Sequence, residues 1–139
     1  MSGANKQLVR SFFEALSSGD LERLWSFLDE ESTWEVCAAE IAGAGLHRGR
    51  EIVEEFLGPV RGWFEPGDPK VEIETMIAEG NLVAVEAEGR GRFLGGTEYH
   101  NRYSFVLEVR GDRIGAVREY MDTEYAHRIV AEAVPGAGS

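Results

Sequence analysis

The sequence has a single cysteine, Cys37, among its 139 residues. One cysteine excludes an intrachain disulfide and any metal site built from several cysteines. No apolar run approaches the length that a membrane-spanning helix needs. The N-terminus, MSGANKQLVR, lacks the apolar core of a secretory signal. We therefore expect a cytoplasmic protein that does not insert into a membrane.

Basic residues are also scarce. Lys and Arg total 14 against 25 Asp and Glu, which gives a net charge of −11. A surface of this sign repels nucleic acids and anionic membranes, so neither is expected as a partner. The length is typical of one domain. We expect a single domain over residues 1–133 and a disordered C-terminal tail over residues 134–139.

The common catalytic and cofactor motifs are absent. The chain has no phosphate-binding glycine loop, no dinucleotide fingerprint and no nucleophile elbow. His47, His100 and His127 lack the spacing of a zinc site, so we predict neither a metal nor a cofactor. His47 could reach the mouth of a pocket or be an exposed loop histidine, and we expect His127 to face solvent.

Helical periodicity dominates the first part of the chain. Leu8, Phe12 and Leu16 form the i, i+4, i+8 stripe of a buried helix face. Asp20 follows as the N-cap of a second helix, LERLWSFLD. A third helix, REIVEEFL, should end or kink at Pro59, because the residue before a proline resists the α conformation.

The rest of the chain predicts mostly strands. A short strand over 33–37 leads into a Gly- and Ala-rich loop, AAEIAGAGLHRGR. Four strands then follow over 71–77, 82–93, 97–109 and 113–123, separated by turns, and a short helix could end the chain at 124–133. In the first of these, one set alternates against another: Val71, Ile73, Thr75 and Ile77 against Glu72, Glu74 and Met76. This order is α+β, and helices on one face of a curved sheet would leave a conical cavity.

Three polar residues stand out on the third of these strands. Tyr99, Asn101 and Tyr103 share one strand parity, which continues into the apolar residues that follow. On an inward face they could orient a carbonyl or hydroxyl group by hydrogen bonding. The alternative is that the tyrosines are packing residues whose hydroxyls reach solvent or backbone.

Glu119 lies near the end of the last strand, and its side chain has two possible directions. It shares its parity with Val117 and Met121, which would point it inward, where burial would raise the pKa of the carboxyl group. Ile114 and Tyr120 belong to a rival apolar face of opposite parity, which would leave Glu119 in solvent. Strand parity alone leaves both arrangements open.

Three blocks of the sequence resemble the SnoaL-like branch of the nuclear transport factor 2-like superfamily: LVRSFFEALSSGDLERLWSFLDEESTWEV, HRGREIVEEFL and YHNRYSFVLEVRGDRIGAVREYMDT. The last block, with its aromatic/Asn strand, Gly-Asp turn and Glu-Tyr-hydrophobic-Asp ending, is the most specific. The resemblance implies a cone-shaped, cystatin-like α+β roll, with about three N-terminal helices packed against a strongly curved, mainly antiparallel sheet. It also implies a homodimer and a pocket for an apolar small molecule.

The resemblance assigns positions to several residues. Glu119 matches a pocket carboxylate on the last strand, and Asn101 and Tyr103 match pocket-wall positions. Glu86 and Glu88 fall where related epoxide hydrolases carry an arginine and a second acid. With Glu86 in place of that cation, epoxide hydrolysis by the same mechanism is disfavoured, and the apolar alternation of their strand places both glutamates in solvent.

These assignments favour a cofactor-independent isomerase, cyclase or hydratase, like the polyketide cyclases and ketosteroid isomerases of the superfamily. Glu119 would move a proton beside a carbonyl whose oxygen is held by Asn101 and Tyr103. The remaining candidates would bind substrate: Trp34, His47, Glu88 and Phe105. The alternative is a binding protein of the same fold without activity. An assembly domain, a third hypothesis, would need Glu119 on the convex side of the sheet.

Overall fold

Two helices open the chain in the computed structural model, which describes residues 2–136: α1 (Ser2–Ser18) and α2 (Leu21–Trp25). The predicted stripe of α1 is buried in the core, where Phe12 has no exposed surface. Asp20 caps α2 as predicted, because its carboxylate accepts a hydrogen bond from the Arg23 N–H at 3.0 Å.

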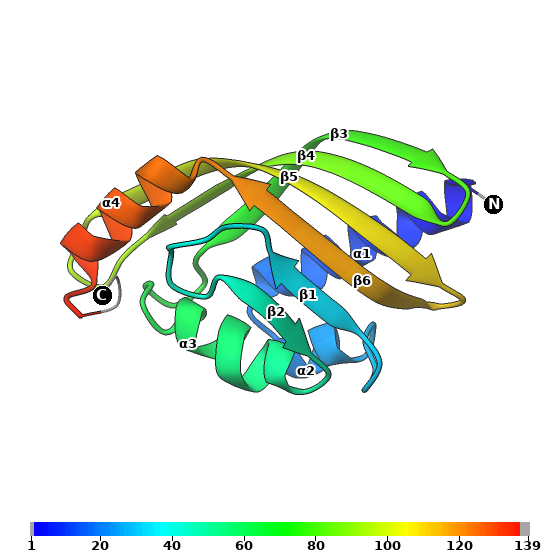
Figure 1. Cartoon of the computed structure of the whole chain (residues 1–139), viewed down its shortest axis with the longest axis horizontal. Coiled ribbons are helices and arrows are strands. Elements are labelled where there is room, and N and C mark those ends of the chain that lie inside the picture. Colours follow the sequence, from blue (N-terminus) through cyan, green and yellow to red (C-terminus); the bar gives the residue numbers. More distant parts are fainter. Residues whose placement is uncertain (1, 137–139) are drawn as a thin grey trace.

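A single six-stranded sheet arches over α1 (Figure 1). Its strands in chain order are β1 (Thr33–Val36), β2 (Gly45–Arg48), β3 (Lys70–Glu79), β4 (Leu82–Arg92), β5 (Glu98–Arg110) and β6 (Arg113–Met121). They lie side by side in the order β2-β1-β6-β5-β4-β3. Only the β1–β6 pair is parallel among these neighbours. The predicted α+β class and the curved, mainly antiparallel sheet are confirmed.

Strand β2 replaces part of the loop expected after the first strand. It pairs antiparallel with β1, so that His47 lies opposite Trp34. Its four residues carry no apolar alternation, and Leu46 is 59% exposed at this edge of the sheet. A strand this short and this exposed leaves little periodic signal in a sequence.

The third helix does not end at Pro59, so of the two predicted outcomes, an end or a kink, the end is wrong. It starts as a π-helix, η1 (Ile52–Leu57), and continues as α3 (Gly58–Arg61). The Gly58 N–H bonds to the Val53 carbonyl, five residues back. Pro59 then occupies the first turn of α3, where its missing N–H leaves no hydrogen bond unmade and its fixed φ suits the helix.

An irregularity in β3 changes which of its side chains face inward. On β3 the register shifts between Ile73 and Thr75, so Glu74 is an extra residue in the ladder. Beyond it Met76 turns inward, and Ile77, predicted on the apolar face, is 64% exposed. The predicted alternation of β3 is therefore wrong after Glu74, because a bulge reverses strand parity.

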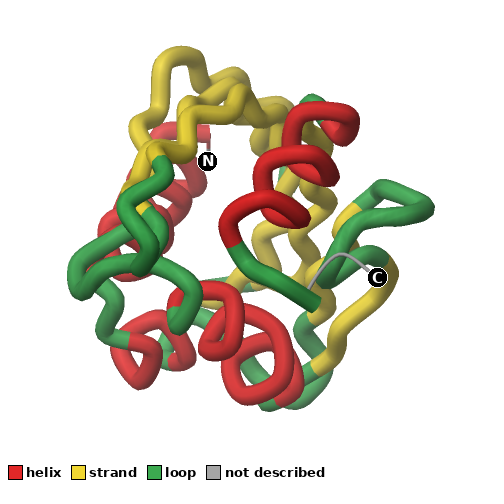
Figure 2. Tube along the Cα trace, turned by 90° about the vertical axis from the view of Figure 1, so that its left-hand side faces the viewer, coloured by secondary structure: helices red, strands yellow, loops and turns green. Residues whose placement is uncertain are grey.

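Helix α4 (Thr123–Ala133) lies across the end of the sheet that is farthest from the N-terminus (Figures 1 and 2). Asp122 caps it by accepting a hydrogen bond from the Tyr125 N–H at 3.0 Å. Ile129 packs against Phe64, Phe93 and Tyr99 in a second apolar cluster. No helix among the described residues is long and apolar enough to cross a membrane.

The predicted disordered tail begins directly after α4. Its residues 137–139 lie outside the described residues. In the described part of the tail, Val134 packs against the second apolar cluster, and its N–H bonds to the Val130 carbonyl at 2.8 Å.

Candidate functional site

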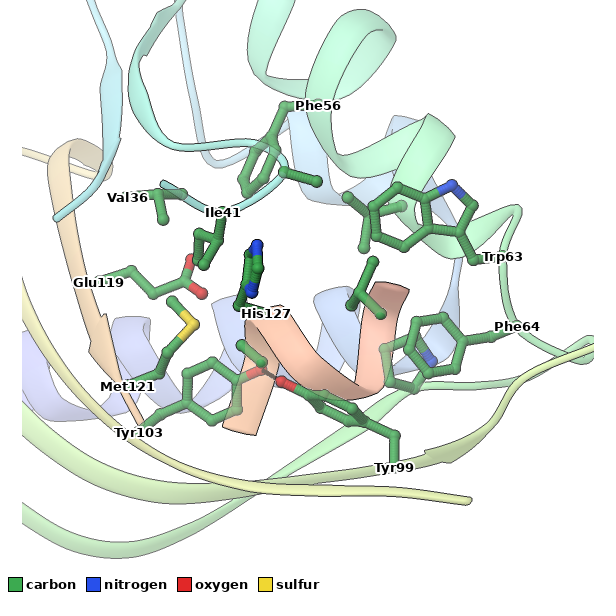
Figure 3. Close-up of a pocket in the computed structure, with 15 residues that line it drawn as sticks. Val36, Ile41, Phe56, Trp63, Phe64, Tyr99, Tyr103, Glu119, Met121 and His127 are labelled. Atoms are coloured by element: carbon green, nitrogen blue, oxygen red, sulfur yellow. Dashed lines mark hydrogen bonds between the residues drawn. The ribbon is translucent and has the colours of Figure 1, made fainter. Parts of the chain in front are cut away.

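A cavity of about 100 Å³ lies between the sheet, the η1–α3 segment and α4 (Figure 3). Phe56, Trp63 and Phe64 line one wall, and Tyr99 and Tyr103 of β5 line another. The ends of β1 and β6, the loop before β2 and one face of α4 complete it. Its surface is mostly apolar, so each polar group in it is conspicuous.

Glu119 is the only acid that lines this cavity among the described residues, and only 9% of it is exposed. The Trp34 indole N–H donates a hydrogen bond of 2.7 Å to its Oε1 atom. Burial raises the pKa of the Glu119 carboxyl from 4.5 to about 7, although the hydrogen bond from Trp34 acts in the opposite direction. Glu119 can therefore both accept and release a proton near neutral pH.

A bulge on β6 determines that Glu119 faces inward. Val109 pairs with Ile114 and Glu108 pairs with Ala116, so Gly115 is the extra residue. Ile114 faces the core before the bulge, and Glu119 shares the inward parity after it. The inward face therefore changes from the parity of Ile114 to that of Val117 and Glu119 at the bulge, and Tyr120, from the rival set, is 45% exposed.

The two tyrosines of β5 are joined through their hydroxyl groups. Burial raises the pKa of Tyr99 to about 12 and also raises the pKa of Tyr103. Both phenols are therefore neutral at physiological pH and act as hydrogen-bond donors or acceptors. The sequence allowed Tyr99 to be a packing residue whose hydroxyl reaches solvent or backbone. In the structure Tyr99 lines the cavity beside Tyr103.

Asn101 lies behind the tyrosines and not in the cavity wall. It is 3% exposed, and its amide nitrogen donates to the Tyr99 hydroxyl at 3.1 Å and to the Asp122 carbonyl at 3.2 Å. Its amide oxygen accepts from the Arg102 N–H at 2.8 Å. The expectation that Asn101 holds a substrate oxygen is corrected: its polar atoms are engaged by the protein, and it orients Tyr99.

Gly89 on β4 makes room for the Tyr103 ring. A Cβ atom at this position would lie 2.7 Å from Cε1 of Tyr103, closer than real Cβ atoms approach a neighbour. The ring therefore lies directly over the backbone of β4. The need for glycine at position 89 could not be found in the sequence, because it depends on how β4 pairs with β5. In that register Gly89 lies opposite Asn101, two residues from Tyr103.

An inner cavity of about 90 Å³ continues toward α1. It shares Glu119 and both tyrosines with the outer cavity, and it is also lined by Trp34 and Phe105. The two predicted apolar wall residues therefore lie deeper than the outer cavity. Phe105 stacks on the Tyr103 ring, with 5.5 Å between centroids.

Two predicted substrate-binding residues lie outside both cavities. His47 stacks on the far side of Phe56 with 4.4 Å between centroids, and its Nε2 atom is hydrogen-bonded with the Gly43 carbonyl at 2.8 Å. Glu88 projects from the outer face of β4, where it contacts His100 and Arg90. Its expected role in the site is corrected, because its buried neighbour Ala87 takes the inward position.

His127 was expected to face solvent, yet it lines the mouth of the cavity from α4 (Figure 3). His127 is exposed, as expected, but its place at the mouth of the cavity was not expected. The signal was weak: Val130, one helical turn later, lines the same cavity. Across residues 2–136, no three His, Cys, Asp or Glu side chains are close enough together to hold a metal ion.

Helices against a bent six-stranded sheet, with an acid at the base of an aromatic cavity, define a protein of the nuclear transport factor 2-like class. The chain belongs to the SnoaL-like domain family, whose model matches residues 9–117. That match stops two residues before Glu119, so the position of the acid comes from the structure. No curated protein matches the sequence.

Solved structures support the same class. Bal32a, from a soil-derived mobile gene cassette, is 25% identical, with a TM-score of 0.78 over 90% of this chain and 94% of that one. An NTF2-like protein from Burkholderia xenovorans LB400 is 27% identical, with a TM-score of 0.74 over 93% and 97%. A candidate SnoaL-like polyketide cyclase from Shewanella putrefaciens CN-32 shares 16% identity and a TM-score of 0.75 over 93% and 86%. This last similarity concerns the fold alone.

Proposed function

We propose that the protein is a cofactor-independent enzyme of the isomerase, cyclase or hydratase type, acting on an apolar carbonyl compound. One observation carries the proposal: the buried Glu119 has a pKa of about 7 and lines the same cavity as two neutral tyrosine hydroxyls. A base with a pKa near the working pH is the most effective proton carrier.

In this mechanism the Glu119 carboxylate removes a proton from the carbon next to the carbonyl. The electron pair of the broken C–H bond moves to the carbonyl oxygen and forms an enolate. The Tyr103 hydroxyl, polarised by its contact with Tyr99, donates a hydrogen bond to that oxygen. In an isomerisation, protonated Glu119 then returns the proton to another carbon of the enolate. In a ring closure, the enolate carbon first attacks a second carbonyl of the substrate, and Glu119 gives the proton to the alkoxide oxygen that forms.

The surrounding residues support these roles indirectly. Asn101 orients Tyr99, and Trp34 holds one oxygen of Glu119 so that the other is free for the proton. Membership of a family with polyketide cyclase-like neighbours agrees with this reaction type. The third hypothesis, an assembly domain with Glu119 on the convex side, is not compatible with a buried Glu119.

The test is a Glu119→Gln variant assayed on cyclic ketones, enones and aromatic polyketides. Loss of about 10²- to 10⁴-fold in turnover with retained binding is expected, since this is the usual contribution of a general base. Glu86→Gln is the matched control, because Glu86 carries the same charge on the outer face and is exposed. Full activity of Glu119→Gln on any substrate found would refute the assignment.

The alternative function is binding without turnover. It is favoured if ligands raise the melting temperature but no product forms on prolonged incubation.

Light scattering tests the homodimer that we also propose on the basis of the family resemblance; a monomeric mass at all concentrations would refute it.

A further inference from the structure

The charged groups along the route into the cavity are mainly acidic. A groove between the loop before β2 and the start of α4 leads to the mouth and shares Ile41 and His127 with the cavity. Glu40 and Glu124 line this groove, and Glu119 lies at the base of the cavity. No Lys or Arg lines the outer cavity or the groove within residues 2–136. With a net charge of −11, the protein attracts cations toward this route.

The walls of the cavity are rich in aromatic rings, of which five line it: Phe56, Trp63, Phe64, Tyr99 and Tyr103. Three of them are backed by a second, nearly parallel ring, which pairs His47 with Phe56, Phe93 with Phe64 and Phe105 with Tyr103. A backing ring covers one face and holds its partner in place. Aromatic faces attract organic cations through their quadrupole.

Glu119 offers an oxygen to such a cation. Trp34 occupies Oε1, and no described residue donates a hydrogen bond to Oε2. The charged and titratable side chains that line the outer cavity with Glu119 come from two elements: Tyr99 and Tyr103 from β5, which are neutral, and His127 from α4. A buried carboxylate with a free oxygen and no cationic partner is the natural counter-ion for a positively charged ligand.

We propose that the cavity binds a small N-methylated organic cation, with Glu119 as its counter-ion and the aromatic walls around its methyl groups. An N-methylated group fits better than a primary ammonium, because the apolar walls offer few acceptors for additional N–H groups. A cavity of about 150 Å³ holds benzene, which is similar in size to a trimethylammonium group. The outer cavity of about 100 Å³ and the inner cavity of about 90 Å³ both border Glu119, Tyr99 and Tyr103.

This inference concerns the cavity of the proposed enzyme but requires no turnover, so the two can fail separately. The linked proton release distinguishes a cation from a neutral carbonyl ligand. At pH 7 about half of the Glu119 carboxyl groups carry a proton. A cation would expel about 0.5 proton per site, whereas a neutral carbonyl ligand, which brings no positive charge to the carboxylate, would release none.

The experiment compares choline with its uncharged carbon isostere, 3,3-dimethyl-1-butanol, by titration calorimetry. At pH 8 we expect choline to bind about tenfold more tightly or better, because only choline gains the cation–π and ion-pair interactions. The preference should shrink at pH 6, where Glu119 is mostly protonated. At pH 7, the difference between the binding heats measured in phosphate and in Tris buffer should show that choline binding releases protons.

Variants make the result specific. Glu119→Gln should abolish the preference for choline over the isostere, and Glu86→Gln, which removes a charge from the outer face, should leave it unchanged. The ratio of the two affinities is an internal control for folding, since both ligands sample the same cavity. Equal or tighter binding of the isostere, proton uptake with choline, or no choline binding at 50 mM would each overturn the proposal.

Discussion

Replacing Glu119 by Gln should stabilise the protein relative to wild type, and increasingly so as the pH rises. The buried carboxyl has a pKa of about 7 when folded, against 4.5 as its ordinary value. Between these two values the folded state binds more protons than the unfolded state, so stability falls with rising pH. At about 1.36 kcal/mol per pKa unit, the full loss above pH 7 is about 3 kcal/mol. Gln has no proton to lose and keeps an oxygen for the Trp34 N–H.

Urea unfolding followed by circular dichroism at pH 5, 6, 7 and 8 measures the effect. The free energy of unfolding of the variant minus that of wild type should rise by about 2.5 kcal/mol from pH 5 to pH 8, because part of the shift lies outside this range. Glu86→Gln, at an exposed position on the outer face, should show no such trend. A difference that stays flat with pH, or that falls, would refute the view that burial raises the pKa of Glu119.

Three further substitutions test the surroundings of the acid. Gly89→Ala should cost about 1–3 kcal/mol of stability by overpacking against Tyr103, whereas Gly95→Ala, where a Cβ would meet no atom within 4 Å, should be nearly neutral in the same urea assay. Trp34→Phe removes a hydrogen bond that lowers the pKa of Glu119, so carboxyl ¹³C NMR should find a pKa above 7 for this residue. An unchanged pKa would contradict the contact between Trp34 and Glu119. Trp25→Phe, at the end of α2, is the control. Asn101→Ala should cost about 1–3 kcal/mol in thermal or urea unfolding, because it removes the hydrogen bonds of a buried amide, including the one to the Tyr99 hydroxyl; a neutral result would argue against its role in orienting the tyrosine.

The class of fold was predictable because it depends on the period of hydrophobicity. The stripe of α1, the change to a period of two near residue 71 and the cap at Asp122 all follow from local rules. What failed were features that local patterns do not determine. Strand β2 is stabilised by pairing with β1, and the helix changes from the π-helix η1 to α3 just before Pro59.

The site was predictable only in part, for a similar reason. A bulge reverses the inward face of a strand, and the apolar pattern around Gly115 does not show where the bulge lies. The same applies at Glu74. Asn101 shows a second limit: strand parity correctly indicates burial, but it cannot tell a residue that faces the cavity from one whose hydrogen bonds are made inside the protein.

The contact between the Trp34 indole and the Glu119 carboxyl gives the protein an optical reporter of its own. Indole emission depends on the electric field along the ring, and ionisation of an acid at 2.7 Å changes that field directly. Trp63, in the wall of the outer cavity, senses arrival of a ligand from another side. Fluorescence of the two residues, separated by single Trp→Phe variants, would thus follow protonation and occupancy of the site without any added label.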